Sequence, residues 1–308
     1  MVVLKKEDRS YDSLFKKLLS TILIFNLCTF PIVQVSASAL TSDVEVYQVS
    51  EFDMYYDLKM KSDSELIQLG FSELEILQLR EFDLFDAMEE RSMLDDETLH
   101  LYGYSENDII ELREYVASGG RLRKVISGST LSLSLSFTGQ VAKRSATGIF
   151  TWKWSRVPFF TMIDSIGVAW QKDAGSGFFN YKNDGYNKVT YTYTKINPNA
   201  YGNATEKGTS NWRVVTNTAI DAKIPISIGK DYFAFSGEGR FRLESTSGDI
   251  TEFYIDAGYG HSIISFEPGI SISPGGVKAG VSFKGGADER HIKRVYNGSF
   301  SVVHNYDD

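Results

Sequence analysis

Cysteine is nearly absent: the sequence of 308 residues contains one, Cys28. The first 39 residues have the pattern of a secretory signal, with a basic stretch, an apolar stretch over residues 18–35 and the cleavage pattern Ala37-Ser38-Ala39. We therefore predict a secreted, extracellular chain that begins near Leu40 and has no cysteine. Such a chain has no disulfide, no thiolate nucleophile and no cysteine–zinc site. The alternative is a protein anchored in a membrane through residues 18–35.

Histidine is also scarce, and the sequence patterns of common enzymes are missing. The four histidines occur singly, none within H-E-x-x-H, and neither G-x-S-x-G nor a phosphate-binding loop occurs. We therefore expect neither a metal site nor a cofactor. Asp256 and His261 lie close together in the sequence and are the candidates for a catalytic or binding pair. The simpler interpretation of His261 is a structural histidine at the end of a strand.

Paired carboxylates are the other catalytic alternative. Glycoside hydrolases place two carboxyl groups about 5–9.5 Å apart. Carboxylates that can supply such a pair are Glu238, Glu244, Asp249, Glu252 and Asp256. The sequence gives no separations between them, so a secreted glycan hydrolase remains an alternative function.

Charge is divided unevenly along the chain. Residues 40–120 contain 21 acidic and 5 basic side chains, a net of −16, whereas residues 121–308 contain 16 acidic and 22 basic, a net of +6. Between them lies Ser118-Gly119-Gly120, which we take as a domain boundary. The basic residues of the second part are dispersed, which does not favour nucleic acid as a partner. They favour an anionic envelope polymer, a membrane surface or a protein partner.

The acidic region contains a tandem repeat. The motif Leu66-x-x-Leu69-Gly70-Phe71-Ser72-Glu73 returns 33 positions later as Leu99-x-x-Tyr102-Gly103-Tyr104-Ser105-Glu106. In each copy the glycine is expected to end one helix and the serine to cap the next. Glu75 and Asp108 then complete capping boxes. Residues 40–120 are therefore predicted to form a small helical repeat region.

Helices this short are marginal in water, so their stability must come from packing. The apolar residues expected to supply the packed face are Leu66, Leu69, Leu77, Leu99, Ile110 and Leu112. Because the two parts of the chain carry opposite net charge, we expect the helical region to dock on the β-rich part.

These repeat units, followed by a β region with a Trp-x-Trp strand, resemble uncharacterised secreted proteins of Gram-positive bacteria. The resemblance covers most of the predicted mature chain. It implies a short helical repeat followed by a β-rich domain, and it assigns no activity, cofactor or site residue.

Alternating apolar residues dominate residues 121–308. Phe150, Trp152 and Trp154 alternate with polar residues, as do Ile166, Val168 and Trp170. Short alternating segments separated by glycine-rich turns predict a mainly β chain with an antiparallel β-sandwich, preceded by the helical part. A β-barrel is the alternative.

The function best supported by the sequence is non-enzymatic binding or interaction at the cell envelope or outside the cell. The main alternative is a pore-forming β protein. Residues Thr130–Thr138 and Gly269–Phe283 alternate serine or threonine with apolar residues, which offers one face to lipid and one to water. The same alternation describes any sheet that is buried on one side.

Overall fold

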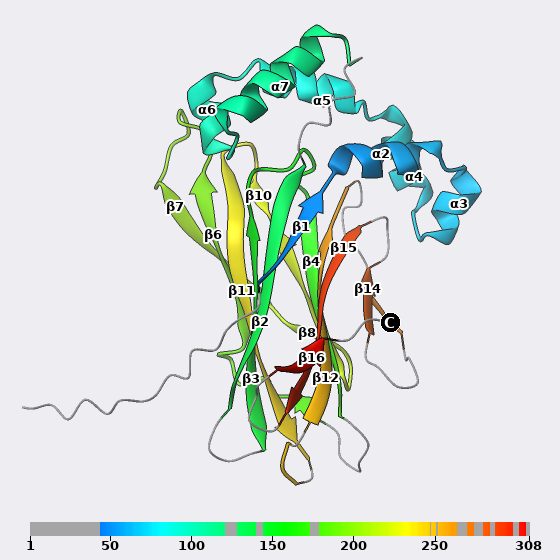
Figure 1. Cartoon of the computed structure of the whole chain (residues 1–308), viewed down its shortest axis with the longest axis vertical. Coiled ribbons are helices and arrows are strands. Elements are labelled where there is room, and N and C mark those ends of the chain that lie inside the picture. Colours follow the sequence, from blue (N-terminus) through cyan, green and yellow to red (C-terminus); the bar gives the residue numbers. More distant parts are fainter. Residues whose placement is uncertain are drawn as a thin grey trace, which may run out of the picture. The chain divides into compact units, whose positions relative to one another are not determined.

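The protein is an antiparallel β-sandwich with helices at one end (Figure 1). The computed structural model describes residues 44–120, 128–139, 144–172, 179–246, 248–250, 252–263, 270–273, 280–283, 287–297 and 302–305. The predicted signal segment and the alternative anchor lie outside these residues.

Two open sheets face each other. Sheet A contains, in order, β1 Val44–Val49, β2 Ser129–Gly139, β3 Ser145–Trp154, β11 Tyr232–Ser245, β6 Lys188–Lys195 and β7 Thr205–Asn211; β5 Phe179–Tyr181 and β10 Ser227–Ile228 also pair with β11. Sheet B contains, in order, β16 Val302–Asn305, β15 Asp288–Asn297, β12 Glu252–His261, β4 Ile163–Lys172, β9 Ala219–Pro225 and β8 Arg213–Thr216. A separate hairpin pairs β13 Ile270–Ser273 with β14 Gly280–Phe283. The predicted sandwich is thus confirmed, and the barrel alternative is not.

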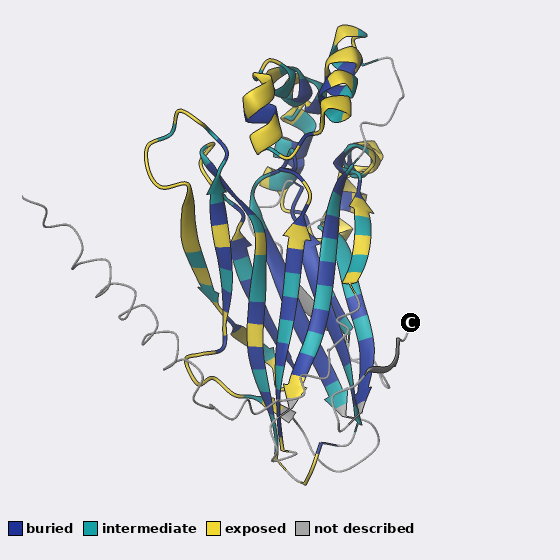
Figure 2. Cartoon of the chain, turned by 60° about the vertical axis from the view of Figure 1, so that its left-hand side comes forward, coloured by how far each residue is buried: buried dark blue, intermediate teal, exposed yellow. Residues whose placement is uncertain are grey.

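The core lies between the two sheets and is built from alternate positions of their strands (Figure 2). Trp152 and Trp154 reach it from β3 in sheet A, whereas Trp170 reaches it from β4 in sheet B. All three are about 1% exposed. The two aromatic strands seen in the sequence are therefore neighbours along the chain but belong to opposite sheets.

The helices form two copies of a three-helix unit. The first helical repeat is α2 Glu51–Met60, α3 Asp63–Gln68 and α4 Glu73–Glu81. The second helical repeat is α5 Leu84–Ser92, α6 Asp96–Leu101 and α7 Glu106–Ala117. Arg80 donates hydrogen bonds to the carbonyls of Lys59 and Lys61 and to Asp63. Arg113 donates to the partners 33 positions later, Ser92, Leu94 and Asp96.

The predicted caps are present in both helical repeats. Ser72 with Glu75, and Ser105 with Asp108, form capping boxes at the starts of α4 and α7. Before each of these helices, Gly70 and Gly103 adopt positive φ angles of 96° and 87°. A residue with a Cβ is strained in that conformation, so glycine is needed at both turns.

Two expectations about the helical region need correction. Residues 44–49 form strand β1, which pairs with β2 along its whole length, so the helices are inserted between two neighbouring strands of sheet A. The expected apolar face is only partly buried. Leu66, Leu99 and Leu112 are buried, whereas the exposed members are Leu69, Leu77 and Ile110. Each unit has three helices rather than the two that the motif alone indicates.

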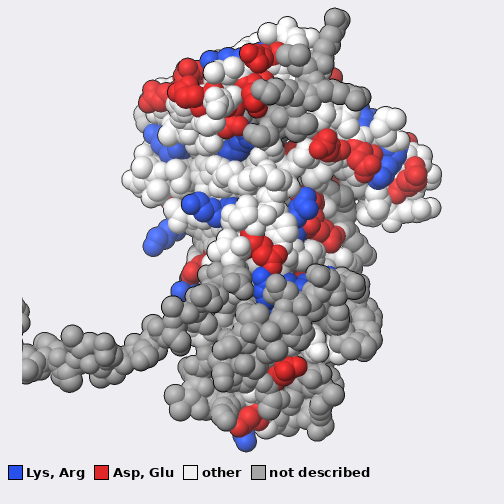
Figure 3. Space-filling view, viewed as in Figure 1, with Lys and Arg blue, Asp and Glu red and all other residues white. Residues whose placement is uncertain are grey.

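The helical repeats contact the sandwich through the segment that joins β3 to β4. Arg91 of α5 donates to the carbonyl oxygens of Val157 and Pro158 at 3.0 Å each. Arg156 lies 3.2 Å from Asp108 of α7. The docking expected from the sequence is therefore observed. Acidic side chains gather on the helices (Figure 3), and these contacts with the sandwich are local hydrogen bonds and an ion pair.

The central tryptophans generate a stability prediction. Trp154 is buried, and its indole N–H donates to the Tyr259 hydroxyl at 3.0 Å. We expect Trp154→Ala to lower the free energy of unfolding by about 3–5 kcal/mol, because it leaves a cavity and removes a buried hydrogen bond. The matched control is Tyr201→Ala, at a fully exposed position, which should change it by less than about 0.5 kcal/mol. Chemical denaturation measures both; equal effects would contradict a structural role for Trp154.

Candidate functional site

Strand β12 carries polar residues on both of its faces, and these define the candidate site. It is a central strand of sheet B, paired with β4 on one side and β15 on the other. Because successive side chains alternate, odd-numbered residues from Phe253 to His261 face the core and even-numbered residues face outward. The inward face ends in a buried ionic cluster, and the outward face supports the β13–β14 hairpin.

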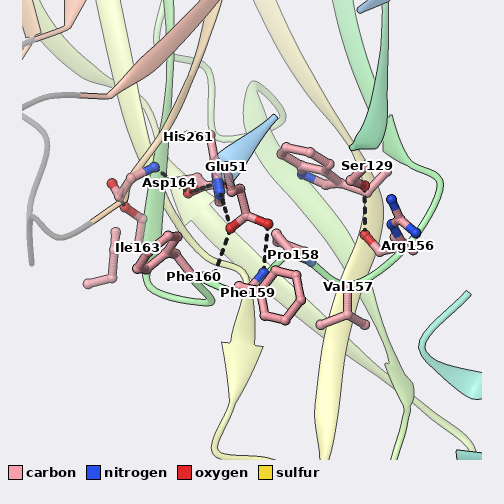
Figure 4. Close-up of polar contacts among 12 residues, drawn as sticks. Glu51, Ser129, Arg156, Val157, Pro158, Phe159, Phe160, Ile163, Asp164 and His261 are labelled. Carbon is pink, nitrogen blue, oxygen red and sulfur yellow. Dashed lines mark hydrogen bonds and ion pairs between the residues drawn. The ribbon is translucent and has the colours of Figure 1, made fainter. Parts of the chain in front are cut away.

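The inward cluster is centred on His261, the last residue of β12 (Figure 4). Its Nδ1 lies 3.1 Å from both carboxylate oxygens of Asp164 on β4, and its Nε2 lies 3.3 Å from Glu51 of α2. Glu51 also accepts the backbone N–H groups of Phe159 and Phe160 at 2.7 and 2.8 Å. We call Glu51, Asp164 and His261 the buried His261 cluster. It connects sheet B to the first helix and to the β3–β4 segment.

Electrostatics keeps His261 charged despite its burial. Burial alone lowers the pKa of the imidazole, but the charge and hydrogen bonds of Asp164 and the contact with Glu51 raise the pKa from 6.5 to about 10. Tyr259 donates to Asp164 at 2.6 Å, and burial together with that carboxylate raises its pKa well above the ordinary value. An imidazolium with these neighbours holds its proton tightly near neutral pH, so it is suited to a structural role rather than to proton transfer.

The outward face of β12 holds a second histidine cluster. Nδ1 of His291, on β15, lies 2.9 Å from Asp256, and Nε2 lies 3.3 Å from Glu289. Burial lowers the pKa of His291, but hydrogen bonds to the two carboxylates outweigh it and raise the pKa to about 9. Both carboxylates also bind the hairpin. Asp256 accepts the N–H of Val281 at 2.9 Å, and Glu289 accepts the N–H of Phe283 at 2.7 Å.

Glycines on the same face make room for the hairpin. A Cβ at Gly260 would lie 2.6 Å from the Phe283 ring, and one at Gly258 would lie 2.9 Å from it. Val281 and Phe283 form a small apolar cluster with Ala169 and Ala219. We call Asp256, Gly258, Gly260, Glu289 and His291 the hairpin seat. Its glycines leave space for the Phe283 ring. Its carboxylates accept two backbone N–H groups of β14, which a neighbouring strand would otherwise accept.

The structure separates the two candidate residues suggested by the sequence. Asp256 and His261 are five positions apart on one regular strand, so they point to opposite faces of sheet B and do not form a pair. Each has another partner: Asp256 contacts His291, and His261 contacts Asp164 and Glu51.

The carboxylates considered for glycoside hydrolysis are also dispersed. Glu238 and Glu244 lie six positions apart on β11, a separation of about 20 Å along a strand. Glu252 and Asp256 lie four positions apart on β12, about 13 Å. These distances exceed the range of a glycosidase pair. The first two residues face outward from sheet A and the second two from sheet B, so these four carboxylates do not converge. Asp249 is exposed and precedes β12.

Sequence reasoning missed Glu51, Asp164, Glu289 and His291 as site residues. Glu51 is 210 positions from His261 in the sequence. The local pattern around Glu51 shows only the start of a helix, and that around Asp164 shows only the start of a strand. A signal for the hairpin seat was present in the alternation of Gly258 and Gly260 with apolar residues on a central strand, since a strand glycine often marks the close approach of another segment.

The buried His261 cluster predicts a pH dependence of stability. The folded state binds the His261 proton more tightly than the unfolded state, so the stabilisation is complete below about pH 6.5 and is lost as pH rises toward 10. The free energy of unfolding should fall by up to about 1.4 kcal/mol per pH unit for each such histidine. We expect His291→Gln to keep the His261 share of this slope between pH 6.5 and 9, measured by urea denaturation.

The matched variant for that measurement is Glu51→Gln, which removes one carboxylate from His261 and should move the loss of stability to lower pH. If the stability of His291→Gln were constant between pH 6.5 and 9, His261 would not be charged in the folded protein. Far-UV circular dichroism at each pH provides the control for folding.

No family model matches the sequence, and no curated protein does. Among solved structures it is similar to a collagen-binding domain from a Staphylococcus aureus adhesin, with 11% identity over 51% of this chain and 93% of that chain and a TM-score of 0.25. It is also similar to a pore-forming protein, with 9% identity, coverage of 58% and 90% and a TM-score of 0.28.

The Clostridium perfringens NetB toxin in its membrane-inserted form gives 8% identity, coverage of 57% of this chain and 94% of that chain, and a TM-score of 0.27. Likenesses of this size carry no functional argument. Within the described residues, no helix has the length and apolar character needed to cross a membrane.

Proposed function

We propose that the chain is a secreted, membrane-active protein whose β13–β14 hairpin leaves the hairpin seat and inserts into a lipid bilayer. The observation that carries the proposal is the docking of the hairpin as a separate two-stranded sheet on the outer face of sheet B. The signal pattern of the first 39 residues supports export.

The place of the hairpin in the chain supports its release. It is inserted between β12 and β15, which are themselves adjacent antiparallel strands. Its contacts with sheet B include two backbone N–H donations to carboxylates of the seat and a small apolar cluster with Ala169 and Ala219. The hairpin can therefore detach without breaking any ladder of the two main sheets.

The sequence of this insertion is suited to a membrane strand pair. Apolar residues occupy alternate positions in two segments of nine and seven residues, and a transmembrane β-strand has about 9–11 residues. The alternate residues are Ile264, Phe266, Pro268, Ile270 and Ile272 in the first segment, and Val277, Ala279, Val281 and Phe283 in the second. Serine, lysine, glutamate and glycine occupy the positions between them, which gives one face for lipid and one for water.

The register of β12 with β15 indicates how the residues of the inserted hairpin would pair. Along β12 and β15 the last pair is His261 with Asp288. Continued in that register, Phe266 faces Phe283 and Ile272 faces Val277, with Pro274-Gly275 at the turn. In the docked hairpin Phe283 instead pairs with Ile270. Apolar residues thus face apolar residues in both registers, and insertion requires a shift of four positions. A closed barrel needs at least about eight strands, so several copies must assemble.

The test of this proposal uses single cysteines in the chain from residue 40, which has none of its own. Fluorescent labels at Val281→Cys and Phe283→Cys should be quenched by nitroxide-labelled lipid when the protein permeabilises phosphatidylcholine vesicles. The matched control is Ser282→Cys on the alternate face, which should be quenched much less. Dye release from the same vesicles measures permeabilisation.

Variants that weaken the hairpin seat should release the hairpin without any change of conditions. Asp256→Asn combined with Glu289→Gln should speed dye release, because the N–H groups of β14 lose their charged acceptors. If these variants lose stability but release no dye, and all three labels stay unquenched, the hairpin is a static cover of sheet B and the proposal is wrong.

A second candidate function is binding of an anionic envelope polymer on sheet A. A groove of about 680 Å³ runs over the outer faces of β3, β11, β6 and β7. Lys153, Lys188 and Lys207 reach it from three different strands, beside threonine and serine hydroxyls, and the one acidic lining residue, Glu238, is paired with Arg240. Three cations over a hydroxyl-lined surface favour a phosphate-bearing polyol.

Replacing all three lysines of this groove with glutamine should weaken binding of poly(glycerol phosphate), most strongly at low salt, because exposed charges are screened as salt rises. Lys182→Gln provides the matched control, since Lys182 is paired with Glu244 outside the groove. Binding is measured by fluorescence anisotropy at two salt concentrations. Equal affinities for the triple variant and the wild type would exclude the groove as the binding surface.

A further inference from the structure

The turn between the second and third helices occurs in both helical repeats but has different neighbours in each. In the second repeat, the turn between α6 and α7 contacts the β3–β4 segment. The carbonyl of Tyr102 accepts the N–H of Val157 at 2.8 Å, and a Cβ at Gly103 would lie 2.5 Å from the carbonyl oxygen of Ser155. Asp108 lies 3.2 Å from Arg156, which also stacks over the ring of Tyr104 at 4.9 Å.

The first repeat has the same backbone at the equivalent turn. Leu69 stands in the place of Tyr102, with φ and ψ of −73° and −5° against −74° and −6°. Gly70 matches Gly103, and Glu75 matches Asp108. Both acidic residues close a capping box through one carboxylate oxygen. The geometry therefore places the Glu75 carboxylate at the position from which Asp108 reaches Arg156.

No β segment of this kind covers the turn of the first repeat in the described part of the chain, because Leu69 is 45% exposed and Gly70 is exposed. Further large apolar side chains are exposed on the same repeat: Met60, Ile67, Leu74 and Leu77. Exposed apolar residues concentrated on one small unit are typical of a surface that binds another molecule.

We propose that the turn between α3 and α4 binds an extended, arginine-bearing peptide segment of another protein chain, in the way that the second repeat binds Ser155–Pro158. The carbonyl of Leu69 accepts a backbone N–H of the segment, Gly70 allows its backbone to approach, and Glu75 pairs with its arginine. This inference is independent of membrane insertion.

One substitution at the turn defines the segment further. The exposed Leu69 replaces Tyr102, so the first site is more apolar and selects an apolar residue after the arginine. Residues 51–81 contain eight acidic and three basic side chains, a net of −5, which favours a basic peptide and disfavours anionic lipid headgroups.

The experiment uses a labelled synthetic peptide with the sequence of residues 153–160, KWSRVPFF, added to the chain from residue 40. We expect saturable binding of one peptide per chain, measured by fluorescence anisotropy, and at least about tenfold weaker binding of the same peptide with alanine in place of arginine. In the protein, Glu75→Gln retains the capping box but removes the charge, and should weaken binding by a similar factor. Leu69→Arg should do the same by repulsion.

Control variants in the second repeat separate this site from displacement of the internal segment. Asp108→Asn, which matches Glu75→Gln, and Ile110→Arg, at an exposed apolar position, should leave peptide binding unchanged, and thermal melting checks that every variant is folded. The proposal is overturned if no saturable binding occurs up to millimolar peptide. It is also overturned if Asp108→Asn abolishes binding and Glu75→Gln does not, since the peptide would then replace residues 155–158 in the second repeat.

Discussion

The buried contact between His261 and Asp164 is the interaction on which the rest of the structure depends. An imidazolium removed from water is strongly destabilising unless its partners are charged and fully hydrogen-bonded. Here Asp164 accepts hydrogen bonds from Tyr259 and from the N–H of Ser262 as well. Glu51 accepts two backbone N–H groups on the opposite side. Because removing any one partner leaves a buried charge uncompensated, sheet B, α2 and the β3–β4 segment must assemble together.

This requirement explains why the helices are inserted where they are. Strand β1 pairs with β2 from Val44 to Val49, and α2 begins two residues later with Ser50 as its cap. The pairing of β1 therefore fixes the position of Glu51 at the first turn of α2, beside His261. A helical region joined to the sandwich by a flexible linker would not hold a carboxylate at a buried site. The insertion within sheet A supplies the rigidity that the buried His261 cluster needs.

Local sequence patterns predicted the local parts of this fold. The capping boxes of Ser72 and Ser105, the glycine turns and the inward-facing tryptophans each depend on residues within a few positions, so a single sequence reveals them. Partners far apart in the sequence were beyond that reasoning. Strand β1 is rich in valine, which favours a strand, but it directly precedes the helical residues, and its place in sheet A depends on pairing with β2, about 85 positions later. The exposure of Leu69, Leu77 and Ile110 is set by tertiary packing, which the repeat motif does not specify.

The candidate sites show the same division. The carboxylates and histidines were visible in the sequence, but their pairing is set by strand parity and by cross-strand register. Asp256 and His261 are close in sequence and belong to opposite faces, whereas His291 faces Asp256 because β12 and β15 are adjacent. The alternation of Gly269–Phe283 suggested a hairpin for lipid, but the sequence alone did not show a docked hairpin with a seat of its own.

In the proposed function, the two ionic clusters on β12 divide the molecule into a part that stays folded and a hairpin that moves. The inward cluster joins His261, at the end of β12, to Glu51 of α2. The insertion that contains the hairpin follows β12 in the chain. The outward cluster binds the hairpin itself, through acceptors that β14 can exchange for another strand. In the proposed function, motion of the hairpin stops at Ile263, because the N–H of Ser262 donates to Asp164 and Ile263 packs in the core of the helices. The sandwich stays folded while residues beyond Ile263 change partners.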